Sequence, residues 1–148
     1  MAHYRQPNRF DRHVMNPVIA GLTWLGLSFW GSRVLEVRGR TSGEPRRVPV
    51  NLLEHEGRRY LVAPRGHTQW VRNLRAADGE GALLLGRRRE GFHAAELADE
   101  EKEPVLRAYL RRWKWEVGQF FDGVGPESSS AELERIAPDH PVFRLGRG

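Results

Sequence analysis

The sequence predicts an α+β domain in which a small antiparallel β-barrel has helices packed outside it. Short runs of apolar residues, many of them β-branched, recur between tight turn signals, which is typical of antiparallel strands. One helical pattern lies between the third and fourth of these runs, and a long one follows the fifth. Five or six short strands interrupted in this way favour a barrel over a parallel sheet.

The first three expected strands are residues 33–38, 46–54 and 58–63. Val, Leu and Tyr residues supply their apolar positions, which is the composition that pleated, half-buried strands favour. The turn at residues 54–57 has the sequence Glu-His-Glu-Gly and leads directly into the third strand. The second and third strands should therefore form a hairpin.

A short helix is expected over residues 68–77, with Thr68 as its N-cap. Its buried face would be formed by Trp70, Leu74 and Ala77. Two further strands, 82–85 and 90–97, should be joined around the arginine-rich turn 86–89.

The remaining expected elements are mainly helical. The acidic segment 99–103 suits a helix N-terminus, and Pro104 favours a separate short first turn. The buried stripe of the long helix that follows would comprise Val105, Leu106, Tyr109, Leu110 and Trp113. Ser129 and Glu132 match a capping pattern before a short helix, and residues 141–145 should form the last strand.

The composition limits the possible chemistry. The 148 residues are expected to comprise a flexible segment, 1–13, and a single domain, 14–148. Cysteine is absent, which excludes thiol catalysis, disulfides and cysteine–zinc sites. The 24 Lys+Arg residues outnumber the 19 Asp+Glu residues, and all but Lys102 and Lys114 of the former are arginine. This balance favours anionic partners.

Residues 16–30 form an apolar stretch that is too short for a spanning helix and lacks a cleavage pattern typical of a secretory signal. A helix here would have an apolar face comprising Val18, Ile19, Leu22, Leu25 and Phe29. It would either cover the barrel or rest on a membrane surface. We expect a cytoplasmic protein with at most weak, peripheral membrane association.

The connection between the first two strands is the most informative segment. It comprises Gly39, Arg40, Thr41, Ser42, Gly43, Glu44, Pro45 and Arg46. The two glycines permit positive φ and let the backbone N–H groups of Thr41 and Ser42 approach a ligand closely, while the proline stiffens the exit. Arginine matches phosphate or carboxylate oxygens with a planar fork. The loop is therefore either an anion-binding site or an ordinary solvated hairpin tip.

Four motifs in order carry a resemblance: Leu35–Arg46, Val48–Asn51, Tyr60–Arg65 and Trp70–Ala76. Together they resemble the deazaflavin (coenzyme F420)-dependent nitroreductase and quinone reductase family. That family is a branch of the split β-barrel flavoproteins, which also include flavin reductases and PNPOx-like proteins. The resemblance extends from about residue 33 to 97, and more loosely to 141–145.

The resemblance implies hydride transfer from reduced F420 to a quinone or another conjugated or nitro acceptor. It implies that the loop Gly-Arg-x-Ser/Thr-Gly-x-Pro-Arg holds the phosphate and glutamate tail of the cofactor. The cofactor-binding residues that it implies are Arg40, Thr41, Ser42, Gly43, Pro45, Arg46, Ala63, Pro64, Arg65, Trp70 and Asn73.

The chain departs from the family pattern in two ways. Thr41 stands where many relatives have lysine, so one tail contact is either weaker or supplied by Arg47 or Arg65. No tyrosine follows Tyr109, so we do not expect reduction of nitro drugs. Four aromatic residues would then either wall the substrate side or pack in the core: Trp113, Trp115, Phe120 and Phe121.

The residues themselves agree with chemistry carried by a cofactor, because the chain has neither a cysteine nucleophile nor a Gly-x-Ser-x-Gly elbow. His67 is a weak candidate for the final proton donor, and an exposed loop histidine is the alternative. His55 and His93 have no second ligand at metal spacing, so we expect no metal site.

Other functions of a small basic barrel are alternatives to this one. A barrel of this kind can bind FMN as its cofactor, or bind haem or a fatty acid without catalysis. A basic barrel that binds nucleic acid is disfavoured, because the aromatic residues do not alternate with arginines on one strand face. We expect a small-molecule acceptor and no nucleic acid, and a homodimer is left open.

Overall fold

The computed structural model describes residues 32–147, apart from the side chains of Trp115 and Glu116. The expected flexible segment and the apolar stretch 16–30 therefore lie outside the described residues. In the described part, no helix has both the length and the apolar character that crossing a membrane requires.

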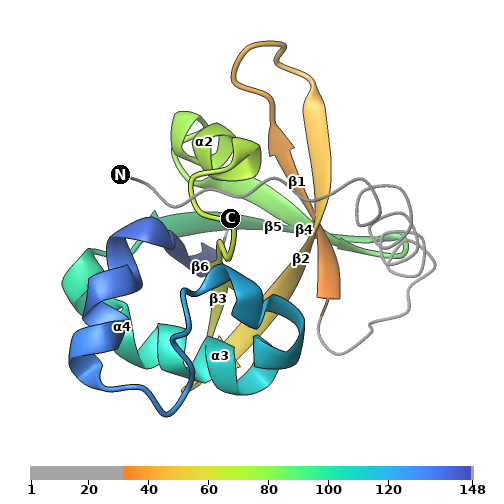
Figure 1. The fold of residues 1–148 in the computed structure, drawn as a ribbon. Helices are drawn as coiled ribbons and strands as arrows, with labels where there is room; N and C mark the ends of the chain where they lie inside the picture. Colours follow the sequence, from red (N-terminus) through yellow and green to blue (C-terminus); the bar gives the residue numbers. More distant parts are fainter. Residues whose placement is uncertain (1–31, 148) are drawn as a thin grey trace.

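Six antiparallel strands close into a barrel, which confirms the predicted fold class (Figure 1). The strands are β1 (Ser32–Arg38), β2 (Pro45–His55), β3 (Arg58–Val62), β4 (Glu80–Leu85), β5 (Arg88–Glu96) and β6 (Val142–Arg147). Their order around the barrel is β1-β2-β3-β6-β5-β4, and β4 pairs with β1 to complete the circle. The C-terminal strand β6 thus separates β3 from β5.

A first hydrophobic core fills the barrel. Its buried members on the strands are Leu35, Val37, Leu52, Leu61, Leu83, Phe92, Ala94 and Phe143. Helix α2 (Gln69–Ala76) contributes Val71 and Leu74 to the same core. Trp70 and Ala77, which were expected on the buried face with Leu74, are only partly buried against this core, and Val71 was not expected there. This packing fixes the orientation of α2 relative to β1.

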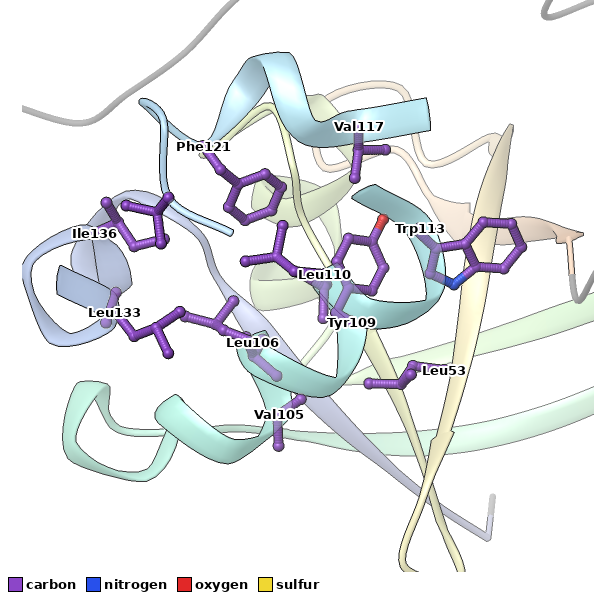
Figure 2. Packing of buried hydrophobic residues seen from close by; sticks show 14 of the residues in the cluster. Leu53, Val105, Leu106, Tyr109, Leu110, Trp113, Val117, Phe121, Leu133 and Ile136 are labelled. Atoms are coloured by element: carbon purple, nitrogen blue, oxygen red, sulfur yellow. The ribbon is translucent and has the colours of Figure 1, made fainter. Parts of the chain in front are cut away.

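A second core lies outside the barrel, between the sheet and the C-terminal helices (Figure 2). The short 3-10 turn η2 (Asp99–Glu101) precedes α3 (Glu103–Val117), as Pro104 predicted. A 3-10 turn, η3 (Gly118–Phe120), follows α3, and η4 (Ala137–Asp139) follows α4 (Ser130–Ile136). The side chains that Figure 2 labels converge from α3, α4, β2 and the segment after η3.

The two predicted N-caps differ in outcome. The Ser129 hydroxyl accepts a hydrogen bond from the Glu132 N–H at 3.2 Å, which confirms the cap of α4. Thr68 occupies the N-cap position of α2, but its side chain makes no capping hydrogen bond. Its Oγ1 is buried without a hydrogen-bond partner among the described residues. The N-cap position of Thr68 was predicted correctly, whereas the capping hydrogen bond expected from its side chain does not form.

Candidate functional site

The connection between β1 and β2, residues 39–44, folds into a tight turn that is held by its own hydrogen bonds. The Gly39 N–H donates to the Glu44 carbonyl at 2.8 Å, and the Gly43 N–H donates to the Gly39 carbonyl at 2.9 Å. The Glu44 N–H donates to Ser42 Oγ at 3.2 Å. Gly43 has a φ of +74°, a conformation that side chains with a Cβ rarely adopt.

Gly39 is needed in this turn for a different reason. A Cβ at Gly39 would lie 2.8 Å from Ser42 Oγ and 3.2 Å from Arg46 Nε. The Ser42 hydroxyl also lies 3.3 Å from Arg46 Nη2, which donates to it. The absence of a side chain at residue 39 therefore lets the serine and the arginine come together at the base of the turn.

Two backbone donors in the turn have no acceptor. The N–H groups of Gly39, Arg40, Gly43 and Glu44 all donate within the described part of the protein. Within that same part, no hydrogen bond is formed by the N–H groups of residues 41 and 42. Both residues are exposed, so these two donors are available to a ligand or to water.

Asn73 on α2 anchors the turn to the body of the protein. Its Oδ1 accepts two hydrogen bonds from Arg40, one from the backbone N–H at 3.1 Å and one from Nη1 at 2.8 Å. Asn73 is only 6% exposed, whereas Arg40 is exposed. Figure 1 shows the β1–β2 connection at the same end of the barrel as α2. The structure therefore brings together Arg40 and Asn73, which lie in separate motifs of the sequence.

The segment after β3 is fixed by a different set of contacts. The Ala63 N–H donates to the Pro141 carbonyl at 2.9 Å, and the Ala63 carbonyl lies 3.2 Å from Nδ1 of the buried His140. The Arg65 guanidinium carbon lies 5.2 Å from the centre of the Phe120 ring, within cation–π range. Pro64 and Arg65 are both half-buried. Phe120 thus contacts one of the predicted cofactor residues.

Both ring nitrogens of His67 have partners. Nε2 lies 3.0 Å from the Pro138 carbonyl, and Nδ1 lies 3.1 Å from Arg75 Nη1. The guanidinium can only donate, so Nδ1 must accept and Nε2 must carry the proton that it donates to the carbonyl. His67 thereby connects Arg75 of α2 to the Pro138 carbonyl in η4.

Arg75 is itself held by Glu96 on β5. Its Nε and Nη2 donate to the two carboxylate oxygens at 2.8 and 2.6 Å, and this hydrogen bonding raises the pKa of Arg75 further above its usual range. The guanidinium therefore stays charged beside His67.

The aromatic residues divide between the two cores. Trp70 is half-buried on α2, and its ring lies 5.9 Å from the Phe143 ring inside the barrel. Trp113 and Phe121 are 1% and 0% exposed and pack in the core beneath α3 (Figure 2). The interpretation as core residues is therefore correct for these two, and the alternative that they wall the substrate is wrong. The Trp115 side chain lies outside the described residues.

Arg47, one of the two proposed substitutes for the family's lysine, is engaged elsewhere. Its Nε donates to Glu36 Oε2 at 2.9 Å, and Arg89 approaches the other oxygen of the same carboxylate at 3.3 Å. The pairing of Arg47 with Glu36 connects neighbouring strands on the outside of the barrel. Arg65, the other proposed substitute, packs its guanidinium against the Phe120 ring.

Comparison with known protein families identifies the chain. The model of the F420H(2)-dependent quinone reductase family matches residues 12–118. The chain belongs to this family. Family members are enzymes, and the reaction assigned to them is F420H2-dependent reduction of quinones. The acceptor is accordingly a quinone-type small molecule.

Several solved structures share the fold of this chain. An F420-H2 dependent reductase, FDR-A, is 20% identical and matches with a TM-score of 0.54 over 78% of this chain and 94% of its own. A protein reported as a domain-swapped dimer is also 20% identical, with a TM-score of 0.55 over 78% and 80% of the two chains. The heme storage protein HutZ from Vibrio cholerae is 12% identical, with a TM-score of 0.52 over 80% and 82%. No curated protein matches the sequence.

Sequence reasoning predicted the residues of the candidate site but not the contacts that connect them. Nothing in the sequence indicated that the Asn73 side chain contacts Arg40, because the two lie 33 positions apart. The contact of Phe120 with Arg65 was also missed. The only available signal for the first pair was that Arg40 and Asn73 both fall within motifs of the family, whereas Phe120 lies outside those motifs.

Proposed function

We propose that this quinone reductase family member binds F420H2 with the anionic tail at residues 40–46 and passes its hydride to a quinone. The observation that carries the proposal is the pair of backbone N–H groups at Thr41 and Ser42 that have no acceptor among the described residues. They lie in a turn that also presents Arg40 and Arg46. Such a combination of backbone donors and guanidinium groups suits phosphate and carboxylate oxygens.

The geometry of the turn fits an anionic group in a further respect. Arg40 uses Nη1 to bond Asn73, so its remaining N–H groups can bind an oxygen while the side chain is held in place. Arg46 is held more loosely, through one 3.3 Å contact with Ser42 Oγ. Pro45 begins β2 at the exposed exit of the turn. We therefore assign the principal tail contact to Arg40 and a supporting one to Arg46.

We assign the ring of the cofactor to the segment Ala63–Arg65 and to Trp70. When bound, F420H2 supplies the hydride. Trp70 would exclude water from the reacting atoms through its position over the barrel core, and the Arg65 guanidinium would stabilise negative charge that develops on the acceptor. Because both His67 nitrogens already have partners, we assign the final proton to solvent rather than to this residue.

A fluorescence titration of the purified protein with F420 and with FMN tests the cofactor. We expect F420 to bind more tightly, because its longer anionic tail can reach all the donors of the β1–β2 turn. The reaction is tested by adding a quinone to the protein with F420H2 and measuring the recovery of F420 absorbance as F420H2 is oxidised. Tighter binding of FMN, or binding of neither cofactor, would overturn the proposal.

A further inference from the structure

Asn73 is the single described side chain that bonds both the backbone and the guanidinium of Arg40. It is nine-tenths buried on α2, and that helix is anchored in the barrel core by Val71 and Leu74. Both donors on Arg40 are N–H groups, so the amide of Asn73 must present its oxygen to them. Only one orientation of the Asn73 amide therefore allows both hydrogen bonds with Arg40.

The two hydrogen bonds restrict different degrees of freedom. The bond from the Arg40 N–H, at 3.1 Å, fixes where the turn leaves β1. The bond from Nη1, at 2.8 Å, fixes the far end of a long side chain that would otherwise be free to rotate in solvent. Holding an arginine in its binding geometry before the ligand arrives reduces the entropy lost on binding.

We propose that Asn73 is a positioning residue of the cofactor site, which sets the Arg40 guanidinium and the β1–β2 turn in place to receive the anionic tail of F420. This inference rests on the proposed function. Asn73 acts through Arg40, because its oxygen accepts both hydrogen bonds from that residue and only 6% of the residue is exposed.

The first experiment measures amide hydrogen exchange of Arg40 by NMR in the free protein. Asn73→Leu has similar volume and no acceptor, so the Arg40 N–H should exchange about tenfold faster or more than in the wild type. Asn73→Asp keeps an acceptor oxygen and should restore slow exchange. Unchanged exchange in Asn73→Leu would show that the amide does not hold the turn, and this readout does not depend on any ligand.

The second experiment measures affinity for F420 and for the deazaflavin without its tail. Asn73→Leu should weaken F420 binding about tenfold and leave the tailless compound within about twofold. Asn73→Asp should also weaken F420 binding, because its carboxylate lies beside Arg40 and opposes the anionic tail. Equal losses for both ligands in Asn73→Leu would overturn the inference, since they would place Asn73 at the ring or in the general fold.

A double-mutant cycle with Arg40→Ala tests whether Asn73 acts through this arginine. The double variant should bind F420 no more than about threefold more weakly than Arg40→Ala alone, because the partner through which Asn73 acts is already gone. Fully multiplicative losses would mean independent roles and would contradict the inference.

Val71→Ala is the matched control on the same helix. Val71 is fully buried, so its truncation should lower the thermal midpoint without changing the ratio of affinities for F420 and the tailless compound. If wild-type protein binds no F420, the proposed function fails, whereas the amide exchange result still decides whether Asn73 holds the turn. If wild type binds F420 and Asn73→Leu binds it equally well, the inference alone fails.

Discussion

The β1–β2 turn and the core beneath α3 are stabilised by different kinds of interaction. Hydrogen bonds hold the turn, and most of its side chains are exposed. Apolar packing holds the core, where residues such as Tyr109, Leu110 and Phe121 are almost completely buried (Figure 2). A typical hydrogen bond contributes about 1 kcal/mol net, whereas removing a large buried side chain costs several times more.

Because of this difference, the stability of the protein and its binding of the cofactor should depend on different residues. Substitutions in the α3 core should reduce the free energy of unfolding and leave cofactor recognition intact in the molecules that remain folded. Substitutions of the exposed side chains in the turn should instead weaken cofactor recognition and change the free energy of unfolding little, because few apolar contacts depend on these residues. Substitutions in each of the two regions test this expectation.

Phe121→Ala should lower the free energy of unfolding by about 3–5 kcal/mol. The ring is fully buried, stacks on His140 with centroids 4.2 Å apart, and also contacts the Tyr109 ring. Denaturant unfolding measures the loss. In conditions where the variant is folded, KM for the quinone should be unchanged. A raised KM for the quinone, with unchanged stability, would indicate instead that Phe121 lines the substrate site.

Arg40→Ala should weaken F420 binding by about 1.5–3 kcal/mol, the range expected for a charge-assisted hydrogen bond. Affinity for the tailless deazaflavin should change little, and so should the thermal midpoint, because the side chain is exposed. Fluorescence quenching with the two ligands measures the difference. Arg38→Ala, an exposed arginine at the end of β1, is the control and should bind both ligands as the wild type does. A large loss of stability in Arg40→Ala would show that it acts through folding.

Gly43→Ala should cost about 1 kcal/mol, because alanine is strained at a φ of +74° although no atom lies within 4 Å of its Cβ. Gly57 in the β2–β3 turn is a matched control, with a φ of +76° and equally open space. Both variants should lower the thermal midpoint by similar amounts. Only Gly43→Ala should also weaken F420 binding, and equal binding by the two variants would argue against a tail site in the turn.

The smallest effect is expected from the ion pair between Arg59 and Glu90. The guanidinium donates to both carboxylate oxygens at 2.8 and 2.7 Å, and this holds the pKa of Glu90 below its usual value of 4.5. A lowered carboxyl pKa adds stability above pH 4.5 that is lost as the pH falls through the pKa of the folded state. Since the pair is largely exposed, its contribution should be about 0.2–1 kcal/mol.

Thermal midpoints of wild type and Glu90→Gln, measured from neutral to acid pH, test this pair. The wild type should be slightly more stable at neutral pH, and the difference should vanish in acid once Glu90 is protonated. High salt should reduce the difference at neutral pH. If the difference in thermal midpoint between the two proteins grew as the pH fell, the prediction would be wrong.

The sequence alone determined the elements and the family. Apolar runs, turn residues and caps are local signals, so the strands and helices fell within a few residues of their predicted bounds, although the last strand begins at Val142 and extends to Arg147. The order of four motifs resembled the F420-dependent reductase family, and the match to the family model confirms that resemblance.

Only the tertiary structure decided how distant residues meet. Closure of β4 onto β1 and insertion of β6 between β3 and β5 depend on packing of the whole sheet, which no local pattern records. The same closure places α2 so that Asn73 reaches Arg40 and His67 reaches both Arg75 and Pro138. The helical spacing of Trp113 was correct, but whether its ring faced a substrate or the core depended on what α3 packs against. Hydrogen bonds and burial between residues tens of positions apart are properties of the folded chain, and they determine which arginine is held ready for a ligand.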